Sequence, residues 1–274
     1  MELTILGSGT AVIREKRLPA SFLLRTDTGK NLLLDAGWGA PMRILQARQD
    51  PQTIDHILIS HPHADHMASL IPILQSMLVA GYDVSGGGWQ ERERKKPLYL
   101  HGYSGFTAHY EELRKIMMPE RAEKYPINIF EYKDDTRFFN DITIIGIEVT
   151  HVPQFWSASA FRIEADGASI VYSGDCGYDE RLVKLAKDAD FGLFDASVPP
   201  WMYKNGPRPN HMSPFECGLV AYKADVKTLA LFHLYDNDTK ENIENDVRKN
   251  FSGELIITED IQRFHIPKAT FHKV

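Results

Sequence analysis

The stretch "HILISHPHADHMASL", residues 56–70, is the most informative part of this chain. It opens with a continuous apolar run, residues 56–60, which predicts a short strand buried on both faces. Three histidines and one aspartate follow within six positions: His61, His63, Asp65 and His66. The apolar spacing after them predicts a helix. Side chains that can donate lone pairs therefore stand where a buried strand ends and a helix begins.

These four side chains have the types and the spacing of a metal site. In an extended chain alternate side chains share a face, so His61 and His63 point the same way. Asp65 and His66 follow at the turn into the helix, and their side chains can point to a position next to that of His61 and His63. Imidazoles combined with a carboxylate suit zinc and its neighbours in the transition series. A lone histidine is more often a surface or core residue, and Asp65 alone could cap the helix, but the whole group favours metal ligands.

Residues 61–66 have the form HxHxDH, which resembles the signature of the metallo-β-lactamase superfamily. Further landmarks of that family follow in order along the chain: His151 at the end of the strand pattern 142–150, Asp175 in the "SGD" context, and His233 behind the apolar run 227–232. The resemblance covers nearly the whole chain. It implies an α/β fold, a four-layer αβ/βα sandwich in which two packed mixed sheets carry helices on their outer faces.

The order of the predicted elements agrees with such a sandwich, because each half of the chain runs from a group of strands into alternating strands and helices. The strand patterns are residues 2–11, 21–26, 31–37, 56–60, 97–102, 127–132, 142–152, 157–165, 169–175, 191–196, 227–233, 254–259 and 262–266. The helical patterns are 42–49, 66–82, 105–118, 179–187, 240–250 and a helix that Ser213 caps with Glu216. No long linker divides the chain. We expect one domain over residues 1–274, with 84–97 as a surface insertion.

The resemblance also implies two divalent metal ions and their ligands. One ion would be bound by His61, His63 and His151, and the other by Asp65, His66 and His233, with Asp175 as the bridge. Histidine and carboxylate sets accept zinc, manganese or iron, and zinc is the ion that we expect first. Two adjacent ions would share a water and activate it.

Other residues narrow the choice within the superfamily. The β-lactamases themselves usually have a cysteine where this chain has Asp175, so the dinuclear hydrolases fit better. The stretches "ADFGLFDAS" and "NHMSPFE" resemble segments of ribonuclease Z and its relatives, in which an acid and a histidine pair beside the metals. Here these two residues are Asp195 and His211. The resemblance implies that Asp65, Asp195 and His211 act in catalysis, with His211 placed to meet the scissile phosphate.

We therefore expect a dinuclear metal-dependent hydrolase whose substrate is a small-molecule or nucleotide phosphodiester. A tRNA 3′-end endonuclease of the ribonuclease Z type, with RNA as partner, is one alternative. The arm with which ribonuclease Z grips tRNA is missing from its usual place, because residues 151–175 suffice only for two strands and a turn. Hydrolysis of a lactone, thioester or sulfate ester is a second alternative, and a non-catalytic ligand-binding or oxygen-sensing protein that holds iron is a third. The sequence is also compatible with a homodimer.

Two further segments hold side chains that could meet a substrate. Large side chains next to His151 and Asp195 could line a pocket or pack in the core: Phe155, Trp156, Trp201, Met202 and Tyr203. In the insertion at 84–97, basic residues and one tryptophan could contact phosphates and a base: Trp89, Arg92, Arg94, Lys95 and Lys96.

Composition argues against several other classes of protein. The formal net charge of −6 speaks against a protein that coats nucleic acid, although a local basic patch is compatible with it. The two cysteines, Cys176 and Cys217, make no disulfide framework. We see no secretory signal pattern and no apolar run of membrane-spanning length. We expect a cytoplasmic protein that does not engage a membrane.

Overall fold

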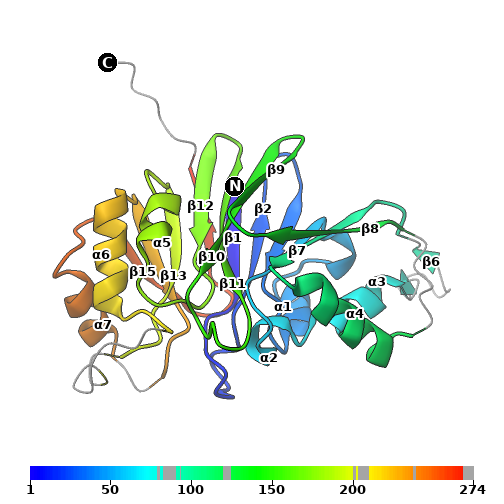
Figure 1. Cartoon of the computed structure of the whole chain (residues 1–274), viewed down its shortest axis with the longest axis horizontal. Coiled ribbons are helices and arrows are strands. Elements are labelled where there is room, and N and C mark those ends of the chain that lie inside the picture. The colour runs from blue at the N-terminus through cyan, green and yellow to red at the C-terminus, as the bar shows by residue number, and fades with distance from the viewer. Residues whose placement is uncertain are drawn as a thin grey trace.

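The computed structural model describes residues 1–78, 81–82, 91–92, 94–119, 125–199, 202, 210–236 and 239–267. Two seven-stranded sheets pack face to face in the middle of the molecule, and helices cover the outer face of each (Figure 1). The expected four-layer sandwich of two mixed sheets is therefore confirmed. Within the described residues, no helix is both long enough and apolar enough to cross a membrane.

The first sheet is built from the N-terminal half of the chain and one strand near the C-terminus. Its strands lie in the order β16 (Arg263–His265), β1 (Glu2–Gly7), β2 (Ser21–Arg25), β3 (Asn31–Leu34), β4 (His56–Ile59), β7 (Leu98–Tyr103) and β8 (Ile127–Tyr132). From β3 to β8 the neighbours are parallel, whereas β1 and β2 pair antiparallel. The helical elements of this half are α1 (Ala40–Gln46), the 3-10 helix η1 (Pro51–Thr53), α2 (Ala64–Met67), α3 (Leu70–Leu78) and α4 (Phe106–Met117).

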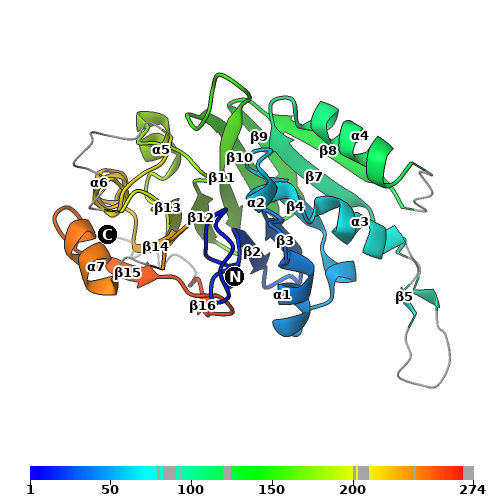
Figure 2. The same cartoon turned by 90° about the horizontal axis from the view of Figure 1, so that it is seen from below.

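The second sheet is built from the C-terminal half. Its strands lie in the order β15 (Glu254–Ile257), β14 (Thr228–Phe232), β13 (Phe191–Asp195), β12 (Ala168–Tyr172), β11 (Ala158–Ala165), β10 (Ile142–Val149) and β9 (Asp135–Phe139). Neighbours from β12 to β15 are parallel, and those from β9 to β12 are antiparallel. Three helices, α5 (Glu180–Leu185), α6 (Pro214–Ala224) and α7 (Lys240–Val247), lie on the side away from the first sheet (Figure 2). A separate short ribbon pairs β5 (Gly81–Tyr82) with β6 (Glu91–Arg92).

Three layers of buried apolar side chains hold the sheets and helices together. In the layer between the sheets, the ring of Phe22 packs against Tyr172 and Phe232 at centroid distances of 5.4 and 5.2 Å. Such aromatic pairs add about 0.5–1.5 kcal/mol beyond the burial of their area. The other two layers lie under the helices of each half. Cys176 and Cys217 belong to the layer under α5, α6 and α7, and both are free and buried.

Two local features differ from the expectation drawn from the sequence. The helix expected over 66–82 is two helices, α2 and α3, and Pro72 lies in the first turn of α3, where a missing N–H breaks no helical hydrogen bond. Strand β9 was not among the predicted strands. It forms a hairpin with β10 through Asn140, whose φ is 52°.

Two described basic residues of the insertion, Arg94 and Lys96, bind to neighbouring parts of the fold, whereas Lys95 is exposed. Arg94 is buried, and its guanidinium donates to the carbonyl oxygens of Gln52 and Pro97 at 2.8 and 2.9 Å. Lys96 pairs with Asp55 at 2.8 Å. Trp89 and the side chain of Arg92 lie outside the described residues, so the expected contact of this segment with phosphates and a base stays a prediction.

Candidate metal centre

The predicted site residues follow the carboxyl ends of strands at one edge of the sandwich. In the first sheet β4 ends shortly before His61. In the second sheet β10, β12 and β14 end shortly before His151, Asp175 and His233. Strand β10 runs in the same direction as β12, because both are antiparallel to β11. The loops after these strands therefore converge, as they do in other α/β folds that bind ligands at this edge.

A close approach of two loops brings the halves of the site together. Gly174 has a φ of +55°, and a Cβ added there would lie 2.6 Å from the Cβ of Ser60. The N–H of Ser159 donates to the carbonyl oxygen of Ser60 at 2.8 Å. A side chain at Gly174 would push the loops apart and so separate His61 from Asp175.

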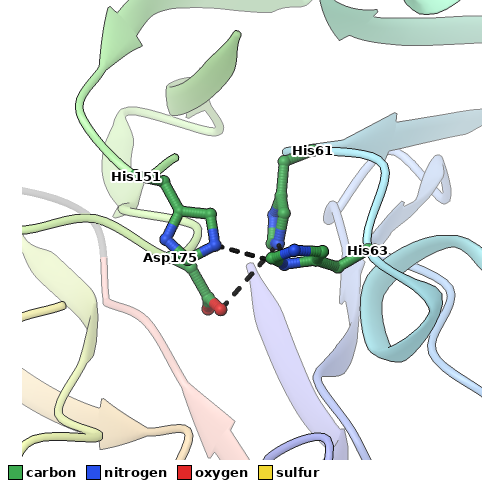
Figure 3. Close-up of side chains that lie close together, drawn as sticks. All are labelled: His61, His63, His151 and Asp175. Carbon is green, nitrogen blue, oxygen red and sulfur yellow. Dashed lines mark hydrogen bonds and ion pairs between the residues drawn. The ribbon is translucent and has the colours of Figure 1, made fainter. Parts of the chain in front are cut away.

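The first group of candidate ligands is His61, His63, His151 and Asp175, whose ligand atoms lie within 4.8 Å of one another. Two of them come from the loop after β4 and two from the second sheet, and all four point toward a common centre (Figure 3). Nδ1 of His63 lies 2.9 Å from Nε2 of His61 and 3.2 Å from Nε2 of His151. Oδ2 of Asp175 lies 3.9 Å from Nε2 of His61.

Hydrogen bonds on the far side of two rings turn their lone pairs toward this centre. Nδ1 of His151 donates to the carbonyl oxygen of Asn210 at 2.8 Å, which leaves Nε2 unprotonated. The hydroxyl of Ser60 donates its only proton to Asp35 at 2.6 Å, so it accepts from Nδ1 of His61 at 3.0 Å. Burial lowers the pKa of both imidazoles, so their neutral, metal-binding form is favoured.

The second group of candidate ligands is Asp65, His66, Asp175 and His233, again within 4.8 Å of one another and all buried. Nε2 of His233 lies 3.3 Å from Oδ2 of Asp65 and 3.4 Å from Oδ2 of Asp175. Asp175 belongs to both groups, as a bridging carboxylate would. His233 has a φ of 60°, and left-handed backbone at a residue other than glycine costs about 1–3 kcal/mol and often accompanies a functional site.

The chemistry of these residues fits metal ions. Nε2 of His66 and Oδ1 of Asp175 are both buried and lie 3.3 Å apart, and neither has a hydrogen-bond partner of good geometry within the described part of the chain. Four buried carboxylates gather here: Asp35, Asp65, Asp175 and Asp195. Buried negative charge at this density needs a positive counterpart. Burial would lower the pKa of His66, but the carboxylates of Asp175 and Asp35 raise it well above its ordinary value. Divalent cations would supply the same compensation and use the free lone pairs.

Asp35 supports the second group and was missing from the sequence-based assignment. It is fully buried and accepts the N–H and the hydroxyl of Ser60, both at 2.6 Å. It also accepts the Nδ1 proton of His66 at 2.6 Å and the hydroxyl of Tyr172. The bond to His66 fixes the ring and leaves Nε2 free for a metal. The signal that could have found Asp35 is its position directly behind the apolar strand β3, in "LLLDAG".

His211 and Asp195 form a pair beside both groups. Nδ1 of His211 donates to Oδ2 of Asp195 at 2.8 Å, and Oδ1 of Asp195 accepts the N–H of Ser197 at 3.0 Å. The ring of His211 contacts those of His151 and His233, with centroids 4.8 and 5.4 Å apart. Its side chain is 28% exposed, whereas Asp195 is fully buried. The acid therefore holds the histidine at the open side of the site.

Comparisons with known proteins agree with this geometry. A family profile described as "Beta-lactamase superfamily domain" matches residues 30–234. The chain belongs to the metallo-β-lactamase superfamily. A protein of Haloferax volcanii named ribonuclease Z is 25% identical over 98% of this chain and 96% of its own length. The superfamily indicates a metal-dependent hydrolase, and the resemblance to ribonuclease Z-like members that the sequence suggested is confirmed.

Solved structures show the same fold. The metallo-β-lactamase fold protein YhfI from Bacillus subtilis superposes with a TM-score of 0.76 at 18% identity and covers 96% of this chain and 98% of its own. Human tRNase Z, short form, superposes with a TM-score of 0.75 at 18% identity, covering 97% of this chain and 100% of its own. At this identity the likeness establishes the architecture and not the activity.

Of the large side chains expected near the site, the structure describes three: Phe155, Trp156 and Met202. Phe155 is exposed, and Trp156 lies edge-on to His63, with ring centroids 5.2 Å apart. Met202 is half-buried, and its N–H donates to the carbonyl oxygen of Pro199. Trp201 and Tyr203 lie outside the described residues.

Proposed function

We propose that this protein is a dinuclear metal-dependent phosphodiesterase that acts on a small-molecule or nucleotide substrate. One ion would be held by His61, His63 and His151 and the other by Asp65, His66 and His233, with Asp175 between them. Bound there, two divalent ions would supply a Lewis acid and a water of lowered pKa. Zinc is the ion we propose first, because imidazole nitrogens dominate the donor set.

The observation that carries this proposal is the hydrogen bond between His211 and Asp195 at the open side of the metal centre. Asp195 fixes the ring and occupies Nδ1, so Nε2 is the nitrogen that remains for a substrate. A diester releases an alkoxide and gathers negative charge on its phosphoryl oxygens. A proton held at Nε2 of His211 could stabilise that charge or be transferred to the leaving oxygen. Asp65, proposed above as a metal ligand, would also act as the proton acceptor on the buried side.

The segment between His151 and Asp175 supports a small phosphodiester over precursor tRNA. It consists of the loop 150–157, β11, the turn 166–167 and β12. All of it is described, and none of it forms an arm. RNA remains the alternative substrate because some relatives are named ribonuclease Z. Precursor tRNA therefore belongs in the substrate screen.

The test compares His211→Ala with the wild-type protein on a dinucleoside monophosphate, which releases an alkoxide, and both proteins are loaded with zinc or manganese. We expect kcat to fall by about 10² or more, because general acid–base groups contribute about 10²–10⁴-fold. Metal content should not change, since His211 lies outside the proposed ligand set. His109→Ala is a matched control, because His109 bonds to Tyr103 away from the centre.

Two outcomes would speak against the proposal. If His211→Ala kept wild-type activity on phosphodiesters but lost activity on a lactone or sulfate ester, the enzyme would be an esterase of another class. Efficient cleavage of precursor tRNA at its 3′ end, with slower turnover of small diesters, would instead favour the ribonuclease Z alternative.

A further inference from the structure

An aromatic pair lies on the loop that follows His151. Phe155 is 70% exposed, and its ring packs against Trp156 with centroids 5.6 Å apart and planes tilted by 39°. Trp156 in turn meets His63 edge-on, at 5.2 Å and 89°. A continuous series of ring contacts therefore runs from solvent to one of the proposed metal ligands.

The backbone of this loop is fixed by hydrogen bonds. The N–H groups of Phe155 and Trp156 both donate to the carbonyl oxygen of Val152, at 3.0 and 3.4 Å. The hydroxyl of Ser157 donates to Glu148 at 2.9 Å, where β10 is still paired. The loop joins β10 to β11 at the lower edge of the molecule, near α2 (Figure 1). The aromatic pair is thus held in a defined place beside the metal centre.

An exposed aromatic ring by itself is ordinary on a protein surface. Phe138, on the edge strand β9, is 77% exposed and illustrates the ordinary case. Phe155 differs because its inner neighbour Trp156 touches a proposed ligand. In addition, Nε1 of Trp156 is buried and makes no hydrogen bond within the described part of the chain. A buried donor without a partner is costly, by about 1–3 kcal/mol, and is unusual where a side chain serves packing alone.

We propose that Phe155 and Trp156 form a stacking surface for the base of a nucleoside phosphodiester, which places its phosphate at the metal centre. This inference rests on the proposed phosphodiesterase function and narrows its substrate class to diesters that carry a nucleobase. Aromatic side chains stack on every base, since each base has a π face. Phe155 offers no hydrogen-bonding group to read a base edge, so the preference is for a base over none rather than for one base.

The experiment measures kcat/KM for a dinucleoside monophosphate and for two analogues, each with one base replaced by hydrogen. The three diesters differ only in the number and position of the bases that can stack on an aromatic ring. Wild-type protein should favour the intact diester over at least one analogue by about fivefold to a hundredfold, the range typical of one stacked base. Phe155→Ala should reduce that preference by slowing the intact diester toward the rate of the analogue, because only the Trp156 part of the surface remains.

The controls separate stacking from damage to the metal centre. Phe138→Ala removes an equally exposed ring on β9 and should keep the full preference. Phe155→Tyr should retain the preference for the intact diester, because the aromatic face is kept. Metal content should be the same in all variants, since Phe155 is not a proposed ligand and its ring packs against Trp156.

A binding measurement provides a readout without turnover. Equilibrium dialysis of metal-loaded protein with thymidine 5′-monophosphate should show at least about fivefold weaker binding to Phe155→Ala than to wild type. Binding of ribose 5-phosphate, which has no base, should be unchanged by the substitution.

Failure of this inference can be told apart from failure of the proposed function. If wild-type protein hydrolyses all three diesters at equal rates, or if Phe155→Ala keeps the preference, the stacking surface is refuted and the phosphodiesterase stands. If metal-loaded wild-type protein hydrolyses none of the three but cleaves another ester, both the proposed function and this inference are refuted.

Discussion

At the scale of single residues, Asp35 organises the site without being a proposed ligand. It binds the backbone and hydroxyl of Ser60 and the Nδ1 proton of His66, so it orients ligands from the loop after β4. Through the Ser60 hydroxyl it also sets which nitrogen of His61 carries a proton. Partners of this kind typically change metal affinity by about 10–100-fold when they are replaced.

Replacing Asp35 with Asn should therefore weaken metal binding by about tenfold or more. The amide keeps the size of the side chain and tolerates the left-handed φ of 54° at this position, but it accepts the imidazole proton of His66 less strongly. Competition titration with a chromophoric chelator measures the change.

Asp55→Asn is the matched control for this prediction. Asp55 is also buried, and it accepts the N–H of Asn31 at 3.0 Å and pairs with Lys96, with none of the proposed ligands among these partners. Equal losses of metal affinity in the two variants would mean that the effect comes from general destabilisation rather than from the support of His66.

The contrast between the ligands and Asp35 shows what a sequence can reveal of a site. His61, His63, Asp65 and His66 stand close together in the chain, so local spacing alone groups them. Asp35 meets its partners across 25 residues to Ser60 and 137 residues to Tyr172. Only the folded sheets bring those groups to one carboxylate, and a single aspartate behind an apolar strand is a weak signal.

At the scale of elements, the start of α6 fixes the position of His211. Ser213 accepts the N–H of Glu216 at 3.2 Å, and the carboxylate of Glu216 accepts the N–H of Ser213 at 2.9 Å, so both halves of the capping box are present. His211 precedes this cap by two residues. A frayed first turn would let the histidine move relative to Asp195.

Ser213→Ala should lower the free energy of unfolding by about 1 kcal/mol, the usual cost of a lost N-cap. It should also reduce phosphodiester kcat, by less than His211→Ala does, because the imidazole is still present but less well held. Urea denaturation and steady-state kinetics measure the two effects.

Thr239→Ala separates these effects, because Thr239 caps α7 by accepting the N–H of Asn242 at 3.2 Å. It should cost a similar free energy of unfolding and leave kcat unchanged. A matching loss of kcat in this variant would show that stability alone, rather than the position of His211, controls activity.

The elements could be predicted where their signals are local. The capping box at Ser213 and the apolar runs of β4 and β14 lie in short windows, and the structure has them where they were expected. Strand β9 could not be found in this way, because its "DTRFF" sequence does not alternate and Phe138 faces solvent. Its pairing with β10 stabilises it, and the Asn140 turn was the available clue.

At the scale of the whole molecule, buried histidines away from the metal centre make stability depend on pH. Nδ1 of His56 lies 3.0 Å from Nε2 of His101, and Nδ1 of His101 lies 3.0 Å from the hydroxyl of Tyr132. Burial lowers the pKa of His56 from 6.5 to about 4, and that of His101 well below 6.5. Charged groups that act on His56 are Asp55, Asp141, Lys30 and Lys96.

Metal-free protein should therefore lose stability as the pH falls below about 6.5. A histidine whose pKa is lower in the folded state takes up a proton on unfolding, so acid favours the unfolded chain. Above pH 6.5 this effect of histidine protonation on the free energy of unfolding vanishes. At pH 5, His56 alone should lower the free energy of unfolding by about 2 kcal/mol.

Urea denaturation of wild type and His56→Gln at several pH values isolates the contribution of His56 protonation to the free energy of unfolding. The difference between the two proteins should change by about 2 kcal/mol between pH 7 and pH 5, with the variant less sensitive to acid. A difference that stays constant with pH would show that His56 is not held neutral by burial.

In the proposed function, ligands from both sheets build one dinuclear hydrolytic centre. The most direct measurement adds zinc or manganese stepwise to metal-free protein and follows hydrolysis of bis-p-nitrophenyl phosphate. Activity should be absent without metal and reach its plateau at two equivalents per chain, with no such activation in His63→Ala. Full activity in the metal-free protein, or a plateau at one equivalent, would contradict a dinuclear centre.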